Sequence, residues 1–274
     1  MKPKVIVIAG PTASGKTSLS IELAKIIDGE IISSDSMQIY KDMDIGTAKV
    51  TKEEMQGIKH YLVDCVSPDE RYSVSNYKKD AESAIEQILA KGKKPIIVGG
   101  TGLYIDAVIY SINYPDMEFD EIYRKELMQI AETEEGLEKL YNEAKKIDPQ
   151  AIEKISRNDK KRIIRILEIY KQTGINKTEQ EKESRKEEIK YDFKVFALNM
   201  DRQVLYERIN QRVDKMIEKG LLDEVKTLKE KYNNYPTAMQ ALGYKEVIEY
   251  FENKITYEQM VEKIKQSKTA YGII

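Results

Sequence analysis

Residues 5–17 read VIVIAGPTASGKT, and this stretch decides the fold. Its first five residues form a short, continuous apolar run, which is typical of a strand covered on both faces of a parallel sheet. The next eight match the pattern G-x-x-x-x-G-K-[ST], and an apolar helical period with Leu19 and Leu23 opens directly after them. A strand, this loop and a helix in succession predict a phosphate-binding loop at a helix N-terminus.

The predicted loop binds a diphosphate mainly through backbone N–H groups that turn inward. Lys16 would balance the charge of the bridging phosphate oxygens, and Thr17 would ligate Mg²⁺. The whole binding element comprises Gly10, Pro11, Thr12, Ala13, Ser14, Gly15, Lys16 and Thr17. ATP, GTP and isoprenyl diphosphates all present this anion, so the loop leaves kinases, NTPases and diphosphate-using transferases open.

Strand and helix patterns outside the loop predict an α/β fold, a P-loop NTPase-like parallel sheet flanked by helices. Further strands are predicted at residues 30–34, 61–63, 95–98 and 193–198, and Gly29, Gly92, Gly174 and Gly220 follow predicted helices. Strand patterns are missing from residues 116–190, which we predict to be an inserted all-helical domain. Residues 1–115 and 191–274 would form the core domain, and residues 176–190 a solvated loop.

Composition limits the possible partners and compartment. Lys and Arg number 45 and Asp and Glu number 47, so the net charge is −2 and any polyanion would have to meet local basic patches. The single cysteine, Cys65, fits a reducing compartment, and we interpret it as a small core side chain. No apolar run approaches the length of a membrane helix, so we expect a cytoplasmic protein without a membrane partner.

Several polar residues follow the predicted strands. Asp35 ends the second strand, where it could act as a general base, bind Mg²⁺ or simply cap a turn. Thr101 follows the fourth strand at the same edge. Asp64, which follows Leu62 and Val63, could bind Mg²⁺ directly or through water, or act as a cap. Lys160, Lys161, Arg162 and Arg165 form a basic cluster on a predicted helix whose Ile163 and Ile164 face the core; it could be a phosphate contact or a solvated face.

Six segments, taken in order, resemble the tRNA dimethylallyltransferase family, also called tRNA isopentenyltransferases. They are residues 10–17, 35–40 (DSMQIY), 46–49 (GTAK), 98–104 (VGGTGLY), 158–162 (NDKKR) and 242–246 (LGYKE). The phosphate loop alone is a weak signal, whereas the ordered set is specific and extends over nearly the whole chain.

The resemblance implies transfer of a dimethylallyl group from dimethylallyl diphosphate to N6 of adenosine 37, beside the tRNA anticodon. Diphosphate and Mg²⁺ would occupy the loop with Lys16, Asp35 would accept the N6 proton, and Thr101 would lie near both reactants. The implied tRNA contacts are Asp35, Ser36, Met37, Gln38, Thr101, Arg124, Lys161, Arg162, Ile163, Ile164 and Arg165. The implied partner is the anticodon stem-loop, with no obligate protein partner.

The sequence departs from the family at two places. His60 is followed by Tyr61, where the family often has two histidines, so we assign His60 no catalytic role. Residues 267–274 do not follow the basic ending of the family, and we expect this to affect tRNA affinity. The alternatives to tRNA prenylation are an isopentenyltransferase for free adenine nucleotides, an ATP-dependent kinase, and a tRNA-binding remnant without activity. Tyr40, Tyr104 and Tyr244 are candidates for stacking on bases.

Overall fold

The structure is a computed structural model that describes residues 2–114 and 120–271. The chain forms two compact units, one of residues 1–110 and 189–274 and the other of residues 111–188. The predicted domain boundary at 115–116 and residues 272–274 of the atypical ending lie outside the described residues.

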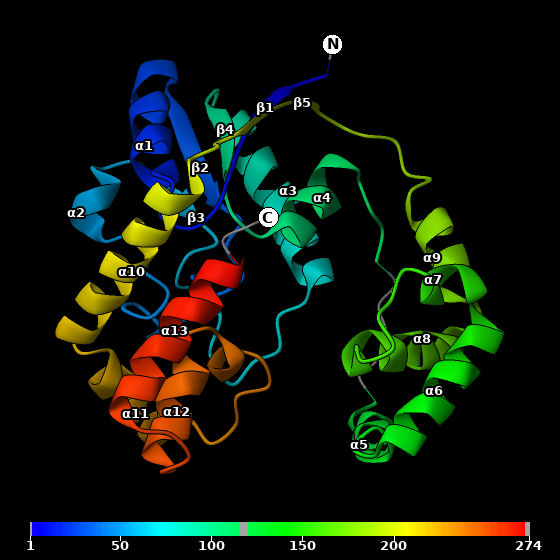
Figure 1. The fold of residues 1–274 in the computed structure, drawn as a ribbon. Helices are drawn as coiled ribbons and strands as arrows, with labels where there is room; N and C mark the ends of the chain where they lie inside the picture. The colour runs from blue at the N-terminus through cyan, green and yellow to red at the C-terminus, as the bar shows by residue number, and fades with distance from the viewer. Residues whose placement is uncertain (1, 115–119, 272–274) are drawn as a thin grey trace. The chain divides into compact units, whose positions relative to one another are not determined.

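The first unit contains a five-stranded parallel sheet, which confirms the predicted fold class (Figure 1). Its strands are β1 (Lys4–Ala9), β2 (Gly29–Ser33), β3 (His60–Tyr61), β4 (Lys94–Gly99) and β5 (Asp192–Ala197). The order across the sheet is β3-β2-β4-β1-β5, and neighbouring strands run parallel in every pair. All five strands lie where the sequence predicts them, apart from one or two residues at their ends.

Helices cover both faces of this sheet, which explains why its central strands are continuously apolar. On one face, α1 (Lys16–Ile27) packs Ile21 and Ala24 against Ile8 and Ile96. On the other face, α3 (Val74–Ala90) and α4 (Gly102–Ile109) pack against Val5, Val7, Ile32 and Ile97. Side chains alternate between the two cores along β1, as the pleat of a strand requires.

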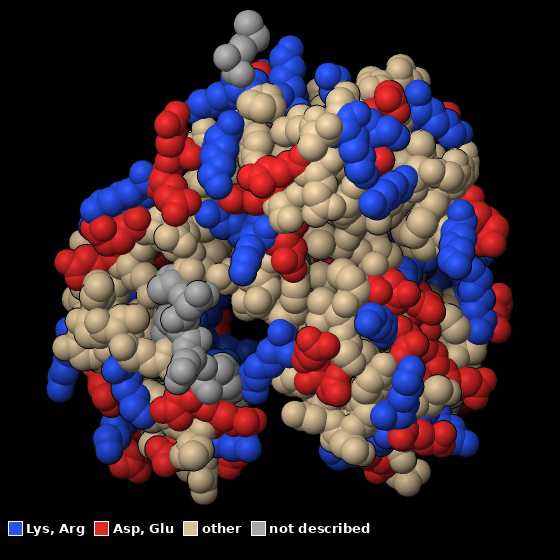
Figure 2. Space-filling view, turned by 180° about the vertical axis from the view of Figure 1, so that it is seen from behind, with Lys and Arg blue, Asp and Glu red and all other residues tan. Residues whose placement is uncertain are grey.

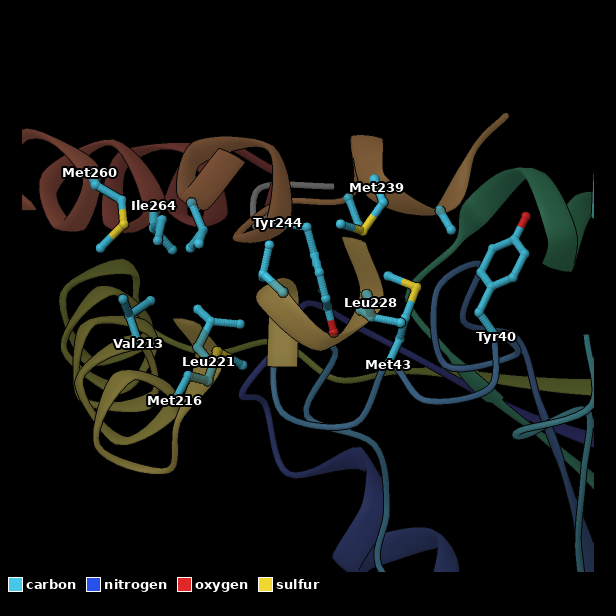
Figure 3. Packing of buried hydrophobic residues seen from close by; sticks show 14 of the residues in the cluster. Tyr40, Met43, Val213, Met216, Leu221, Leu228, Met239, Tyr244, Met260 and Ile264 are labelled. Carbon is cyan, nitrogen blue, oxygen red and sulfur yellow. The ribbon is translucent and has the colours of Figure 1, made fainter. Parts of the chain in front are cut away.

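A third core in the first unit joins the C-terminal helices to residues 37–48. The helices are α10 (Arg202–Glu218), α11 (Leu221–Lys231), α12 (Tyr244–Phe251) and α13 (Tyr257–Tyr271), with a short 3₁₀ turn at Ala238–Gln240. Tyr244 lies in the middle of this cluster (Figure 3). The short helix α2 (Lys52–Met55) follows residues 37–48, and a capping box of Thr51 and Glu54 caps its N-terminus.

The second unit is helical throughout its described part, as predicted. It consists of α5 (Glu121–Ile130), α6 (Glu134–Ile147), α7 (Pro149–Ile152), α8 (Lys160–Thr173) and α9 (Lys177–Ser184). Its core is built around α8, where Ile163 and Ile164 are fully buried, together with Leu140 and Ala144 of α6. Asp148 is buried and caps α7 by accepting the Ala151 N–H, and it also binds Thr178 of α9.

Three local predictions are wrong. Residues 176–190 are not simply a loop, because α9 forms there: Asn176 caps it, and Lys177 pairs with Glu181 one turn later. Gly29, whose place after the predicted helix suggests a C-cap, is not the cap of α1: Asp28, with a φ of 52°, supplies the left-handed turn after Ile27, and Gly29 begins β2. Cys65 is exposed rather than a core residue.

Candidate functional site

The ends of three adjacent strands bring the predicted site together. In the order β2-β4-β1, Asp35 follows β2, Thr101 follows β4 and the phosphate loop follows β1. Because parallel strands end at one edge, the strand order places Thr101 between the carboxylate and the loop. The sequence predicts the common edge, but the middle position of β4 comes from the sheet topology.

Two glycines allow the chain after β4 to fit between its neighbours. A Cβ on Gly99 would lie 2.4 Å from the carbonyl oxygen of Ser34. A Cβ on Gly100 would lie 3.2 Å from the carbonyl oxygen of Gly10 and 3.9 Å from Nζ of Lys16. Backbone therefore approaches both the Asp35 strand end and the phosphate loop closely, which explains the glycine pair in this motif.

The phosphate loop has the backbone conformation that an anion nest requires. Ala13 and Gly15 have φ angles of 62° and 90°, and Gly15 is the N-cap of α1 without a side-chain cap. Nζ of Lys16 donates to the carbonyl oxygens of Gly10 and Pro11 at 2.6 and 2.5 Å. The ammonium group is thus folded over the loop, where phosphate oxygens can replace these carbonyls.

Asp35 forms the start of a tight turn. Its Oδ1 accepts the backbone N–H groups of Met37 and Gln38 at 2.9 and 3.2 Å, and among the described residues none donates to Oδ2. The capping interpretation therefore accounts for only one oxygen of this carboxylate. Thr101 Oγ1 accepts the Ser36 N–H at 3.1 Å, and the Thr101 N–H donates to the Ser34 carbonyl.

Two further cations interact with this candidate site, and the sequence analysis missed both. Arg212 of α10 donates to Thr12 Oγ1 at 3.2 Å, and Lys268 of α13 donates to the Gly46 carbonyl oxygen at 3.0 Å. Arg212 directly precedes the core residue Val213. Its place at the edge of the apolar face of this helix was the only sign in the sequence that its side chain could be partly buried. Nothing in the periodicity of α13 marks Lys268.

The charges of the candidate site act on one another. Burial lowers the pKa of Lys16 to about 8; Asp35 opposes this shift and Arg212 adds to it. Burial and then Arg212 lower the pKa of Lys268 to about 8, against the attraction of Asp35. Burial lowers the pKa of Arg212 as well. Asp35 acts on all three cations, Glu54 also acts on Arg212 and Glu246 on Lys268, yet burial still lowers the pKa of each cation, which favours a polyanionic ligand.

Thr17, the predicted Mg²⁺ ligand, is exposed in the first turn of α1. Among the described residues, no group of three His, Cys, Asp or Glu side chains could hold a metal ion. One hydroxyl fits Mg²⁺ nonetheless, because this ion keeps several waters and takes its other ligands from substrate phosphates.

In the second unit, a buried carboxylate organises two of the predicted arginines. Glu168 is 4% exposed and accepts Arg124 Nη1 through both oxygens, at 2.9 and 3.0 Å. Arg165 Nη1 lies 3.4 Å from the same carboxylate. Lys161 and Arg162 are exposed on α8. Ile163 and Ile164 are fully buried, so they pack beneath the exposed basic residues and their side chains cannot contact RNA.

The remaining candidates have structural roles. Tyr40, Tyr104 and Tyr244 are at most 6% exposed, so the idea that they stack on bases is wrong; Tyr104 stacks on Tyr77 instead, with ring centroids 4.1 Å apart. Asp64 lies beyond β3, which ends at Tyr61, and it pairs with Lys49 at 2.9 Å. His60 Nδ1 lies 2.9 Å from the Ile58 carbonyl, and burial lowers its pKa.

Comparison with known proteins identifies the family. The IPP transferase family model matches residues 38–272. The chain belongs to the IPP transferase family. A tRNA dimethylallyltransferase of Thermoanaerobacter sp. (strain X514) is 50% identical, over 99% of this chain and 87% of that protein. One of Acetivibrio thermocellus is 51% identical, over 98% and 86%.

Solved IPP transferase structures share the fold. The tRNA isopentenylpyrophosphate transferase of Bacillus halodurans matches with a TM-score of 0.71 and 42% identity, over 99% of this chain and 84% of that one. A eukaryotic dimethylallyltransferase described as acting on tRNA matches with a TM-score of 0.77 and 34% identity, over 98% and 68%. At these identities, the likeness extends to the family and not to the fold alone.

The surface of this family member carries charges of both signs. Figure 2 shows Lys and Arg side chains interspersed with Asp and Glu over one face, as the near balance of charges in the sequence implies. In the described part of the chain, no helix combines the length and apolar character that crossing a membrane takes.

Proposed function

We propose that this chain transfers the dimethylallyl group of dimethylallyl diphosphate to N6 of adenosine 37 in tRNA and releases diphosphate. The observation that carries the proposal is the juxtaposition of Asp35 with the phosphate loop. Asp35 follows β2 and the loop follows β1, with β4 between them at the same edge of the sheet, and the Asp35 charge opposes the lowering of the Lys16 pKa by burial. A kinase-like loop beside a carboxylate suits a reaction in which a diphosphate leaves and a weak nitrogen nucleophile loses a proton. With tRNA as substrate, we expect the enzyme to act in the cytoplasm.

In the proposed reaction, the diphosphate lies along residues 10–17. As the allylic C–O bond breaks, negative charge grows on the leaving group, and Lys16, Arg212 and the loop N–H groups are directed at it. Mg²⁺, bound by Thr17 and the phosphates, would further neutralise this charge. Fixed cations in a partly buried pocket need little reorganisation as the charge develops.

The proposed base is Asp35. The adenine N6 lone pair is delocalised into the ring, so removal of the N6 proton as the new C–N bond forms lowers the barrier. Oδ1 is held by two backbone N–H groups, which leaves Oδ2 to accept this proton. Thr101, fixed by its bonds to Ser34 and Ser36, lies between the base and the loop and would contact both reactants.

The proposed tRNA contacts combine residues 35–38 and Thr101 with cations of the second unit. Lys161, Arg162, Arg165 and Arg124 would bind phosphates of the anticodon stem-loop. Glu168 holds two of these arginines in place, so their guanidinium groups are ordered before RNA binds. Ordering beforehand reduces the entropy lost on binding.

The test is incubation of the chain with labelled dimethylallyl diphosphate, Mg²⁺ and unmodified tRNA, with free AMP and with ATP as competing substrates. We expect label on tRNA at one adenosine, little label on AMP and no displacement of dimethylallyl diphosphate by ATP. Tighter binding and turnover of ATP would instead establish a kinase, and label on AMP alone an enzyme for free nucleotides. A folded chain that labels nothing would contradict the proposal.

A further inference from the structure

Two sequence motifs are not explained by the proposed chemistry: residues 46–49 (GTAK) and 242–246 (LGYKE). The first lies in the loop of residues 43–49, after the Asp35 turn, and the second opens α12. The structure brings them together in the first unit. A Cβ on Gly46 would lie 2.4 Å from Cε2 of Tyr244, so the tyrosine ring packs directly on the backbone of the loop.

A single carboxylate holds this loop. Glu224, in the first turn of α11, accepts the N–H groups of Asp44 and Ile45 through Oε2 at 2.9 and 2.7 Å, and that of Gly46 through Oε1 at 3.0 Å. The Tyr244 hydroxyl donates to the same Oε1 at 2.6 Å. Four donors on one ionised side chain form a strong, directional anchor, because bonds to a charged acceptor are shorter and stronger than neutral ones.

Tyr244 orients that carboxylate from the apolar side. Figure 3 shows the tyrosine inside the cluster formed by Leu221, Leu228 and Met43, with its hydroxyl at the end remote from α12. Tyr244 is fully buried, and burial together with Glu224 raises its pKa well above the usual value, so it remains a donor. Lys268 holds the opposite side of the loop by donating to the Gly46 carbonyl oxygen.

The anchored loop reaches the Asp35 turn through Gln38. Nε2 of Gln38 donates to the carbonyl oxygens of Thr47 at 3.3 Å and Ala48 at 3.1 Å. Gln38 also gives its backbone N–H to Asp35 Oδ1. A continuous path of hydrogen bonds therefore joins Glu224 to the proposed base through the loop and one side chain.

We propose that Glu224 is a positioning residue for prenyl transfer, which fixes the loop of residues 44–48 and through Gln38 holds the Asp35 turn in register with the phosphate loop. This inference rests on the proposed function. Residues 38–41 have separate backbone bonds to residues 64–66, as between the Asp64 N–H and the Gln38 carbonyl. Loss of the anchor should therefore displace the turn slightly and leave the sheet and the diphosphate site intact.

The test compares Glu224→Gln and Tyr244→Phe with the control Glu230→Gln, an exposed residue on the same helix. Gln keeps the size of Glu but replaces one acceptor oxygen by a donor that opposes the loop N–H groups. We expect the single-turnover rate with saturating tRNA to fall about 100-fold, which is the scale of a misplacement of about 1 Å. Affinity for dimethylallyl diphosphate should stay within about twofold, and Tyr244→Phe should lose about fivefold in rate.

Hydrogen exchange of the Asp44, Ile45 and Gly46 amides measures the strength of the Glu224 anchor independently of enzymatic activity. We expect exchange at least tenfold faster in Glu224→Gln and unchanged in Glu230→Gln. Unchanged exchange, a rate within threefold of wild type, or a parallel loss of diphosphate affinity would overturn the inference. If Glu224→Gln fails to fold, Tyr244→Phe decides by the same measures. A wild-type chain that binds dimethylallyl diphosphate but labels no tRNA would refute the proposed function instead. The exchange measurement would still show whether Glu224 anchors the loop of residues 44–48.

Discussion

Replacement of Asp35 by Asn isolates the charge of the proposed base from its role in the turn. Oδ1 of Asp35 accepts the N–H groups of Met37 and Gln38, and an asparagine oxygen can accept the same two bonds. Asp35→Ala would lose both bonds and add a stability cost of about 1 kcal/mol, by analogy with a lost cap. Asn therefore changes the chemistry with little change of structure.

The expected loss follows from what a general base contributes. Removing one lowers the rate by about 10²–10⁴, which corresponds to roughly 3–5 kcal/mol of barrier. Binding should respond differently, because the Asp35 charge competes with the diphosphate for the nearby cations Lys16 and Lys268. We therefore expect dimethylallyl diphosphate to bind Asp35→Asn as tightly as wild type or more tightly.

The assay is single-turnover transfer of label from saturating dimethylallyl diphosphate to tRNA, with affinity measured separately by titration calorimetry. Asp106→Asn, an exposed carboxylate on α4, is the matched control and should keep wild-type rate and affinity. A rate of Asp35→Asn within threefold of wild type would show that another group takes the proton. A large loss of diphosphate affinity would show that Asp35 serves the phosphate site.

Three further changes test the electrostatics and packing. Arg162→Ala should weaken tRNA binding and reduce the slope of log K against log salt by about one unit, as expected for one lost phosphate contact. The control Lys139→Ala, at another exposed position, should leave the slope unchanged. Filter binding at several salt concentrations measures the slopes, and equal slopes for Arg162→Ala and wild type would mean that Arg162 is only a solvated surface residue. Lys268→Met should raise the free energy of unfolding at pH 7 by about 3 kcal/mol, since burial lowers the folded-state pKa to about 8, below the usual lysine value of 10.5. That cost of the buried charge is complete below pH 8 and disappears as pH rises to about 10.5, so urea unfolding should show the two proteins converging there; a constant difference would contradict the lowered pKa. Gly99→Ala should destabilise the fold by about 1–3 kcal/mol or more, because the new methyl group would meet the Ser34 carbonyl, while Gly102→Ala has open space and should be neutral in the same unfolding measurement.

The fold was predictable because its signals are local. The apolar run at residues 5–9, the glycine-rich loop and the next helix occupy consecutive positions, and β1 and α1 form there. Residues 176–190 were not predictable in the same way, because α9 lacks an apolar stripe. Its support comes from the cap of Asn176, ion pairs and the bonds of Thr178 to Asp148, about 30 residues earlier. Such support depends on tertiary contacts that periodicity does not record.

The site was predictable where the residues lie directly after strands, as for Asp35 and Thr101. Arg212 and Lys268 interact with the same site from α10 and α13, and only the folded chain brings them there. Glu224 shows the same limit, because its partners at Asp44, Ile45 and Gly46 precede it by about 180 residues. Residues that act through long-range hydrogen bonds leave no pattern in their own neighbourhood.

The cations of the candidate site connect stability to function. Lys16, Arg212 and Lys268 all have lowered pKa values, so the free protein bears a cost for holding these charges out of water near one another. Asp35, Glu54 and Glu246 offset part of this cost, but the pKa values of all three cations remain lowered. A diphosphate supplies the missing negative charge, and binding of a ligand to the native state alone stabilises that state. The arrangement therefore suits a ligand that arrives with several negative charges and gains another as its bond breaks. The bulk charge of −2 does not oppose this, because short-range fields from partly buried cations outweigh a screened net charge.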